Sequence, residues 1–453
     1  MTKTPVVLSP FARIFKRDTF CSLVHYQKGN ISILHPSEAF LLSLLDGAMT
    51  EDNLTQVFST TYGVPMKEAV VTVSTVMRKL AHFFISADDG GTYTRYDPLE
   101  FLFPGFDRQP NFDNPLSKPQ MLGLTLTTHC NFRCRYCSMG SNRVFPQTME
   151  KDTALRLIRE AAGLGVVHLS FGGWEPLLYP AILDVVKAAF ENEMALLFST
   201  NGSLLTESMV KGLIDAGLKG IQVSIDAPTA DLHHYMTDSH DTFDSVISGI
   251  KRLKGAGIWV KTRSVVTSSN LRSVPSLIEM LVDLGIDQIT LGPQHKGACD
   301  IPCQNGEDML DPVAMNSLRE IVGLKTAEHR EREIILGEPE ASWQGPEDVT
   351  LCGHPMEGLM VTTNGDVLFC EFINDRNLAF GNVNMSTLDE IWLGPGHRRF
   401  LDMVLDKGTI NEECGRCDML EKCHSGCFNL SMIDSHNYFA KDPRCPGPEA
   451  MKG

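Results

Sequence analysis

The chain has 453 residues, a formal net charge of −16 and 13 cysteines. This length predicts two or three domains, and the 43% hydrophobic share is typical of a globular protein. The acidic balance disfavours nucleic acid as a partner, because phosphate binding needs a basic face. No apolar run approaches the roughly 18 residues that span a bilayer, and the start has no signal-peptide layout. We therefore expect a cytoplasmic protein without a membrane partner, in which clustered cysteines indicate metal binding rather than disulfides.

Residues 1–90 predict a small separate domain in which three strands precede three helices. Ser37 is the expected N-cap of the first helix, and Cys21 is expected to be a small buried apolar residue. This order of elements is a winged-helix arrangement. Two alternative uses of such a domain are DNA binding, which the net charge disfavours, and packing alone. The strands are expected at residues 12–17, 20–26 and 31–34, and the helices at 37–45, 50–63 and 65–84.

A linker is predicted at residues 91–118, within a stretch rich in Gly, Pro, Asp and Asn. Strand and helix patterns alternate after it, which indicates a parallel sheet of about six βα units, curled into a partial barrel over residues 119–297. The strands are expected at 123–127, 166–171, 195–199, 220–225, 258–266 and 288–291, and the helices at 149–163, 181–192, 206–216, 242–256 and 274–284.

Three cysteines follow the first strand of this barrel. Cys130, Cys134 and Cys137 are spaced i, i+4, i+7, with Tyr136 just before the last. Three thiolates so close together can hold three irons of a cubane cluster and leave the fourth iron open for reaction. A zinc site or a stray group of thiols is the alternative, although zinc sites more often use paired Cys-x2-Cys.

This spacing resembles the CxxxCxxC signature of the radical S-adenosylmethionine (SAM) superfamily, whose core is also a partial barrel. Later loops resemble further motifs of that family: a GGE motif at 171–176, in which Trp174 is inserted before Glu175, a TNG motif at 199–202 and an S-x-D motif at 224–226. Thr267 is a further candidate at the end of a strand. The SAM contacts that the resemblance implies are Tyr136, Gly172, Gly173, Glu175, Ser199, Asn201, Ser224, Asp226 and Arg263.

Residues 298–350 predict a bridging region, with one helix expected at 313–327. Cys299 and Cys303 fall at its start. They are incidental thiols, or one of them ligates a cluster, and a role on the substrate side is a further alternative. Residues 351–453 have little regular patterning beyond a hairpin at 358–370, and such a region needs metal to hold it together. A zinc ribbon is the alternative for the pair Cys414 and Cys417.

The cysteine spacing of this last region resembles the SPASM domain, which holds two auxiliary 4Fe–4S clusters. The resemblance implies that one cluster is bound by Cys414, Cys417, Cys423 and Cys445, and the other by Cys352, Cys370 and Cys427. Fully ligated members of that family have one more cysteine a few residues before Cys352, whereas residues 345–351 here contain none. The resemblance therefore implies that the second cluster has an open iron or borrows Cys299 or Cys303.

The N-terminal domain is similar in length, order and position to the PqqD-like leader-recognition element of ribosomal peptide maturases. Together, these resemblances imply an α/β enzyme with a winged-helix-like domain, a partial (βα)6 radical SAM barrel and a SPASM domain. It would use SAM and three 4Fe–4S clusters, bind a precursor peptide by its leader, and accept electrons from a reductase such as flavodoxin or ferredoxin.

The implied reaction is hydrogen abstraction by a 5′-deoxyadenosyl radical, followed by an intramolecular thioether, carbon–carbon or carbon–oxygen cross-link in the peptide. Three alternatives stay open. The first is a sulfatase-maturating-type protein oxidase, the second a peptide epimerase or decarboxylase, and the third a non-catalytic iron–sulfur electron carrier or sensor.

Overall fold

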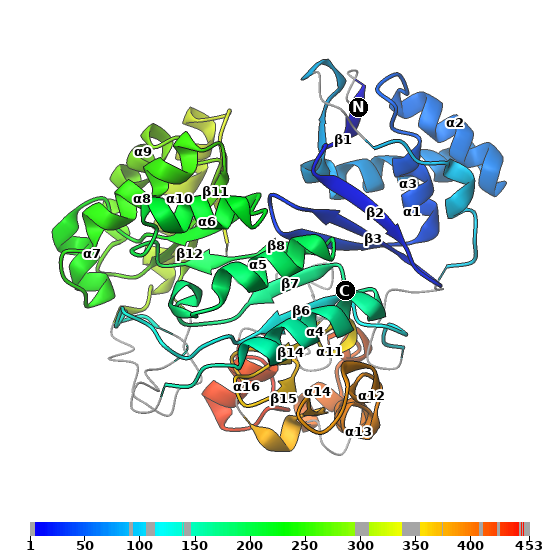
Figure 1. Ribbon diagram of the computed structural model, residues 1–453. Helices are drawn as coiled ribbons and strands as arrows, with labels where there is room; N and C mark the ends of the chain where they lie inside the picture. Colours follow the sequence, from blue (N-terminus) through cyan, green and yellow to red (C-terminus); the bar gives the residue numbers. More distant parts are fainter. Residues whose placement is uncertain are drawn as a thin grey trace. The chain divides into compact units, whose positions relative to one another are not determined.

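The computed structural model describes residues 5–89, 94–105, 114–137, 139, 146–294, 308–337, 354–373, 375–406, 411–423, 426–443, 445 and 447. The chain forms two compact units, residues 1–109 and 110–453 (Figure 1). Cys299, Cys303 and Cys352 fall outside the described residues. Within the described part, no helix has the length and apolar character needed to cross a membrane.

The first unit contains an antiparallel sheet in the order β2-β3-β4, three helices and a separate antiparallel pair, β1-β5. Leu23, Leu34, Val73 and Phe83 are among the fully buried side chains of its core. The elements are β1 (Val6–Leu8), β2 (Ala12–Lys16), β3 (Cys21–His25), β4 (Asn30–Leu34), α1 (Pro36–Ser43), α2 (Glu51–Tyr62), α3 (Met66–Lys79) and β5 (Phe84–Ser86).

Two details of this unit differ from the sequence prediction. Helix α1 is capped by His35 rather than Ser37: the His35 ring accepts a hydrogen bond from the Ser37 backbone N–H, and Pro36 occupies the first helical turn. Helix α3 ends at Lys79 instead of continuing to residue 84. Phe84 instead begins β5, which pairs with β1 from the start of the chain. Such long-range pairing of three-residue strands leaves no periodic signal in the sequence.

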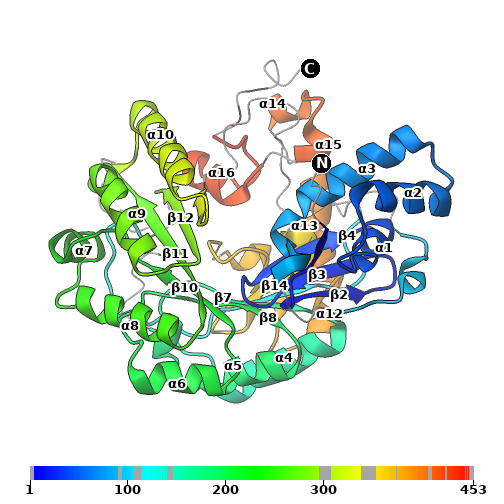
Figure 2. The ribbon, with the colours of Figure 1, turned by 90° about the horizontal axis from the view of Figure 1, so that it is seen from above.

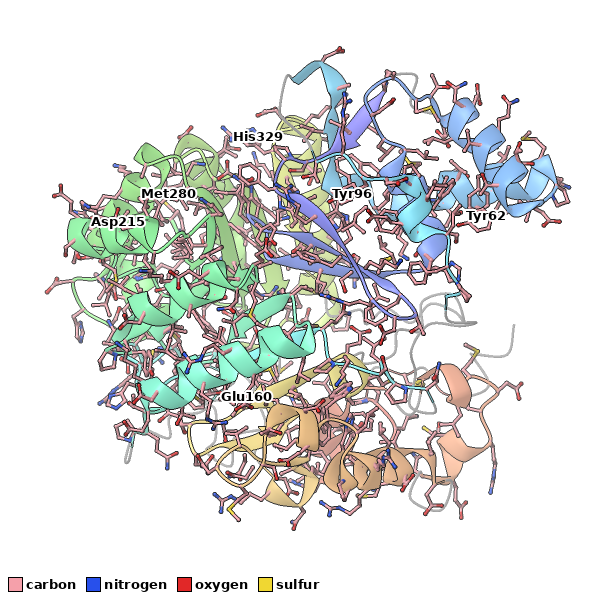
Figure 3. The ribbon with its side chains drawn as sticks, turned by 45° about the vertical axis from the view of Figure 1, so that its right-hand side comes forward. Tyr62, Tyr96, Glu160, Asp215, Met280 and His329 are labelled. Carbon is pink, nitrogen blue, oxygen red and sulfur yellow. The ribbon has the colours of Figure 1, made fainter. Side chains whose placement is uncertain are left out.

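Part of the predicted linker belongs to this first unit. Phe101 is buried against its core, and the Tyr96 hydroxyl accepts a hydrogen bond from the Ile14 backbone N–H at 2.9 Å. Figure 3 labels Tyr96 among the strands of the unit. Cys21 is fully buried, as expected for a small apolar residue.

The second unit contains a curved, mainly parallel sheet. Two hydrogen-bonded sheets, in the orders β16-β15-β14-β6-β7-β8 and β13-β12-β11-β10-β9, meet where β8 passes into β9 at Phe198. The backbone N–H of Gln222 donates to the Phe198 carbonyl at 2.8 Å, which continues the hydrogen bonding across the junction. The strands are β6 (Met121–Leu124), β7 (His168–Phe171), β8 (Ala195–Leu197), β9 (Ser199–Thr200), β10 (Gly220–Ser224), β11 (Trp259–Val266), β12 (Gln288–Pro293) and β13 (Glu333–Leu336).

Helices cover the outer side of this sheet (Figure 2). Most of them bury an apolar stripe and expose their polar face, as the 3.6-residue periodicity predicts. The patterning did not predict α7 or β13, and β13 extends the parallel sheet beside β12. The helices are α4 (Lys151–Leu164), α5 (Ile182–Glu191), α6 (Glu207–Asp215), α7 (Ala230–Thr237), α8 (Phe243–Gly255), α9 (Val274–Asp283) and α10 (Pro312–Glu328).

The C-terminal segment packs on the β6 side of the barrel. The predicted hairpin is present, and β14 (Gly358–Val361) pairs in parallel with β6, which makes the hairpin part of the barrel sheet. A carboxylate oxygen of Glu160 on α4 (labelled in Figure 3) accepts from the Leu388 N–H at 3.1 Å. The remaining elements are β15 (Asp366–Leu368), β16 (Gly381–Asn382), α11 (His354–Glu357), α12 (Leu388–Ile391), α13 (Pro395–Leu405), α14 (Glu412–Gly415), α15 (Leu420–Cys423) and α16 (Phe428–Ser435).

Candidate functional site

A cavity of about 600 Å³ lies at the carboxyl ends of the barrel strands. Its walls come from the loops after β6, β7, β9 and β10, from β11, and from the residues that follow β15. Ligands bind at this end of parallel α/β sheets because the loops there are free to vary on a rigid frame. The predicted site residues that line the cavity are Cys130, Cys134, Tyr136, Cys137, Gly173, Ser199, Asn201, Ser224, Asp226, Arg263 and Cys370.

The cysteine loop is held against helix α7. The backbone N–H groups of Arg133 and Arg135 each donate at 2.9 Å, to the carbonyls of Thr237 and Met236. Phe132 is buried and meets the ring of His233 edge to face. These contacts fix a loop whose three cysteines all open onto one cavity.

The thiol of Cys134 has a pKa raised well above its ordinary value. Burial is the main cause, and the negative charges of Asp226, Cys137 and Cys130 add to it. Thiolates this close repel one another until a cation lies between them. The donor set therefore fits an iron–sulfur cluster with three protein ligands.

Tyr136 connects this loop to the end of β10. Its hydroxyl donates a hydrogen bond to Asp226, whose other carboxylate oxygen accepts from the Val265 N–H at 2.7 Å. Burial raises the pKa of Asp226 to about 6, against the effect of these two hydrogen bonds. Ser224 and Asp226, two residues apart, both line the cavity as the S-x-D pattern predicts.

The glycine loop after β7 approaches the cavity closely. Gly172 does not line it, and a Cβ built on Gly172 would lie 2.7 Å from a carboxylate oxygen of Glu371. Gly173 and Trp174 have φ angles of 55° and 46°, so two successive residues have a left-handed backbone. Glycine adopts this conformation readily and tryptophan rarely does. Trp174 thus occupies a glycine-like position, and its ring lines the cavity.

Glu175 lies behind the cavity wall. Its carboxylate is fully buried and accepts hydrogen bonds from the Leu177 N–H, the Thr200 hydroxyl and the Asn201 N–H, at 3.0, 2.7 and 2.7 Å. Burial raises its pKa to about 7, although these three donors oppose the rise. In this position Glu175 holds the end of β9, so that it positions Asn201 rather than facing the cavity itself.

The other predicted contacts come from β9, the residue after it, and β11. The Asn201 side chain donates to Asn131 in the cysteine loop at 2.8 Å, and the Ser199 hydroxyl accepts from Gln222 at 2.9 Å. Arg263 on β11 has its pKa lowered by burial, so its guanidinium lies in a partly dehydrated wall. Thr267 is buried and is not part of the cavity wall.

Glu371 is a cavity residue that the sequence did not reveal. It directly follows Cys370, and burial raises the pKa of its carboxyl while the Gly173 backbone N–H opposes the rise. Met360 on β14 and Met139 also line the cavity. The sequence pattern does not mark Glu371 or Met360 as cavity residues. They reach the cavity because β14 pairs with β6 and brings the hairpin here.

A second group of cysteines gathers in the C-terminal segment. Cys417 and Cys445 pack against the buried Cys423, and the pKa of Cys445 is raised mainly by burial and further by the charges of Cys414 and Cys417. Four thiols in one place suit a cluster with four protein ligands. Asp442 is fully buried: its carboxylate accepts from the Cys427 N–H at 2.8 Å and its carbonyl from the Cys445 N–H at 2.9 Å. Asp442 therefore links Cys427 to this group.

Comparisons with known proteins agree with these two cysteine centres. The radical SAM superfamily model matches residues 124–281, and SPASM, an iron–sulfur cluster-binding domain, matches residues 352–418. AdoMet-dependent heme synthase of Methanosarcina barkeri (strain Fusaro / DSM 804) is 23% identical and covers 72% of this chain and 96% of its own. PqqA peptide cyclase of Methylobacterium sp. (strain 4-46) is 27% identical over 72% of this chain and 86% of its own.

Solved structures extend the similarity over almost the whole chain. Streptococcus suis SuiB bound to S-adenosylmethionine has a TM-score of 0.66 at 18% identity, over 97% of this chain and 100% of that one. SuiB bound to precursor peptide SuiA has a TM-score of 0.64 at 17% identity, over the same shares. At such identities the structural likeness concerns the fold, whereas the domain matches concern the family. The chain therefore contains a radical SAM domain at residues 124–281, followed by a SPASM domain.

Proposed function

We propose that this enzyme modifies a ribosomally made precursor peptide and installs an intramolecular cross-link in it, either a thioether or a carbon–carbon or carbon–oxygen bond. The observation that carries the proposal is the composition of the cavity wall. The three-cysteine loop forms one part of it and Cys370 with Glu371 forms another. A peptide side chain in this cavity would meet SAM and an auxiliary cluster ligand in a single enclosed space.

The proposed cofactors are SAM and three 4Fe–4S clusters. Cys130, Cys134 and Cys137 would hold the first cluster, Cys414, Cys417, Cys423 and Cys445 the second, and Cys352, Cys370 and Cys427 the third. When bound, the first cluster supplies the electron that cleaves SAM into methionine and the 5′-deoxyadenosyl radical, which removes hydrogen from the peptide. The residues of the chain would bind and orient SAM and the peptide, and would exclude water from the cavity.

Several cavity residues suit these binding roles. The backbone of Gly173 and the polar groups of Ser199, Asn201 and Ser224 offer hydrogen bonds to SAM. Arg263 offers a guanidinium to the carboxylate of its methionine part, in a partly dehydrated wall where the attraction is strong. Glu371, with its raised pKa, is suited to accept a proton from the peptide when the cross-link forms.

The first unit is proposed to bind the leader of the peptide. Strand β4 is at one edge of the sheet β2-β3-β4 in the described residues, so its outer backbone groups can pair with an added strand. Helix α3 exposes the apolar side chains of Met66, Val70 and Val71. The proteins compared support a peptide substrate, because one is a PqqA peptide cyclase and SuiB binds precursor peptide SuiA. A reductase such as flavodoxin or ferredoxin would supply the electron.

Iron and sulfide content after anaerobic reconstitution tests the cofactor assignment. We expect about twelve irons in the wild type and about four fewer in the Cys130→Ala/Cys134→Ala/Cys137→Ala variant, which would form no 5′-deoxyadenosine with dithionite. Zinc without iron, or deoxyadenosine formation that survives the triple substitution, would refute the assignment. Incubation with a candidate precursor peptide then tests the reaction: a mass loss of two hydrogens upon modification is expected.

A further inference from the structure

The solvent side of the cysteine loop carries two arginines. Arg133 and Arg135 are exposed, and so is Asn131, whereas Phe132 is buried and Cys134 lines the cavity. Exposed and inward residues thus alternate along the loop. As a result, Arg133 and Arg135 each stand one residue away from a proposed cluster ligand and face the solvent.

Helix α7 holds the guanidinium of Arg135 in one place. The Nε–H of Arg135 donates to the Tyr235 carbonyl at 2.8 Å, and the guanidinium lies 4.3 Å from the centre of the Tyr235 ring. Tyr235 itself is 45% exposed. A fixed arginine beside a half-exposed tyrosine is typical of residues that dominate binding at protein interfaces, because little side-chain freedom is lost on binding.

The charges of these arginines are available to a partner. Arg156, Arg376 and Arg416 each form an ion pair with a carboxylate. In contrast, no carboxylate pairs with Arg133 or Arg135 within the part of the chain that the structure describes. Helix α7 carries two exposed carboxylates, Asp231 and the C-cap Asp238, and neither forms an ion pair with Arg133 or Arg135 in the described residues. The positive charge of the two arginines is unlike the chain as a whole, which carries −16.

We infer that Arg133, Arg135 and Tyr235 form the docking surface for an acidic protein that donates single electrons. The inference rests on the proposed function, because it assigns the entry point for the electron that the first cluster needs. In this step the donor loses one electron and the cluster gains one, with no atom transferred. An acidic donor would be repelled by the net charge of this chain and attracted by this surface, which would select its orientation at the cluster.

Charge reversal tests the inference on the reconstituted full-length protein. The probe is a flavodoxin in its hydroquinone form, and dithionite is the small reductant that needs no docking surface. In Arg133→Glu/Arg135→Glu we expect flavodoxin binding and cluster reduction, followed by stopped-flow absorbance at low salt, to weaken about tenfold or more. Added salt should slow the wild type toward the variant. Reduction by dithionite and the deoxyadenosine that follows should be unchanged.

Matched variants separate this role from other causes. Lys211→Glu, an exposed charge reversal on α6, should match the wild type with both reductants. Arg416→Glu, beside the proposed auxiliary ligand Cys417, tests whether the electron instead enters through the C-terminal cysteine group. If charge reversal lowers the iron content, Arg133→Gln/Arg135→Gln repeats the measurement without carboxylates beside the cysteines.

Three results would overturn the docking surface: wild-type flavodoxin affinity in both double variants, an equal loss in Lys211→Glu, or a loss confined to Arg416→Glu. Failure of the wild type to cleave SAM with dithionite would instead count against the proposed function, so the two failures are distinct.

Discussion

The Tyr136 hydroxyl donates a hydrogen bond to Asp226, and this contact links the cysteine loop to the end of β10, ninety positions along the chain. Both side chains line the cavity, and Asp226 is 1% exposed. Because the Val265 N–H binds the other carboxylate oxygen, Asp226 bridges the loop, β10 and β11. This buried carboxylate thus adds a second anchor to the loop, besides its contacts with α7.

Removing the Tyr136 hydroxyl should loosen this bridge. In Tyr136→Phe one buried oxygen of Asp226 loses its donor, which costs about 1–3 kcal/mol. We expect a lower urea midpoint for the iron-free protein and weaker SAM binding by the reconstituted protein. Tyr235→Phe, which removes a hydroxyl from an exposed tyrosine near the same loop, is the control. Wild-type SAM affinity and midpoint in Tyr136→Phe would show that the bridge contributes nothing.

Glu175 should make the stability of the protein depend on pH. Its folded-state pKa of about 7 exceeds the ordinary value of 4.5, so the folded chain holds a proton that the unfolded chain has lost. Its contribution to the free energy of unfolding is fully present below pH 4.5 and is lost as the pH rises through 7. This shift corresponds to about 3 kcal/mol.

The Glu175→Gln variant isolates that contribution. Between about pH 4 and pH 8, the wild type should lose about 3 kcal/mol of unfolding free energy relative to this variant. Urea unfolding of the iron-free proteins measures the difference, and Glu207→Gln, an exposed carboxyl on α6, is the matched control. Parallel pH curves for the wild type and Glu175→Gln would show that the burial of Glu175 has no such effect.

The sequence predicted the barrel well because its strands and helices are long enough to carry a period. It also predicted which loops meet, since parallel strands end at one edge of a sheet and Cys134, Asn201 and Asp226 each follow a strand. It failed for Glu371, which reaches the cavity only because β14 pairs with β6, more than two hundred residues earlier. It identified Trp174 as an insertion before Glu175 but did not predict its left-handed backbone, because that conformation at a tryptophan has no signature in the sequence.

The two cysteine groups should separate SAM cleavage from product formation. Cys414 belongs with Cys417, Cys423 and Cys445, away from the residues that line the cavity. Cys414→Ala should therefore lower the iron content and abolish cross-linking, yet leave dithionite-driven deoxyadenosine formation within about twofold of the wild type. Cys134→Ala should abolish both. Loss of deoxyadenosine in Cys414→Ala, with the first cluster retained by electron paramagnetic resonance, would contradict this division.

A charge on the exposed face of α3 should weaken leader binding without touching the chemistry. Val71 is 60% exposed beside Val70 at 37%, and Met66 nearby is 51% exposed. If a leader covers these side chains, Val71→Glu places a carboxylate in an apolar contact and should weaken binding by about tenfold, equivalent to about 1.4 kcal/mol. Fluorescence anisotropy of a labelled synthetic leader from a candidate precursor measures the affinity. Val313→Glu, at a 74% exposed valine on α10, is the control and should bind like the wild type.

Since α3 belongs to the first unit and the cysteine loop to the second, deoxyadenosine formation should be equal in all three proteins. Unchanged leader affinity in Val71→Glu would remove α3 from the recognition surface and leave the edge of β4 as the remaining candidate.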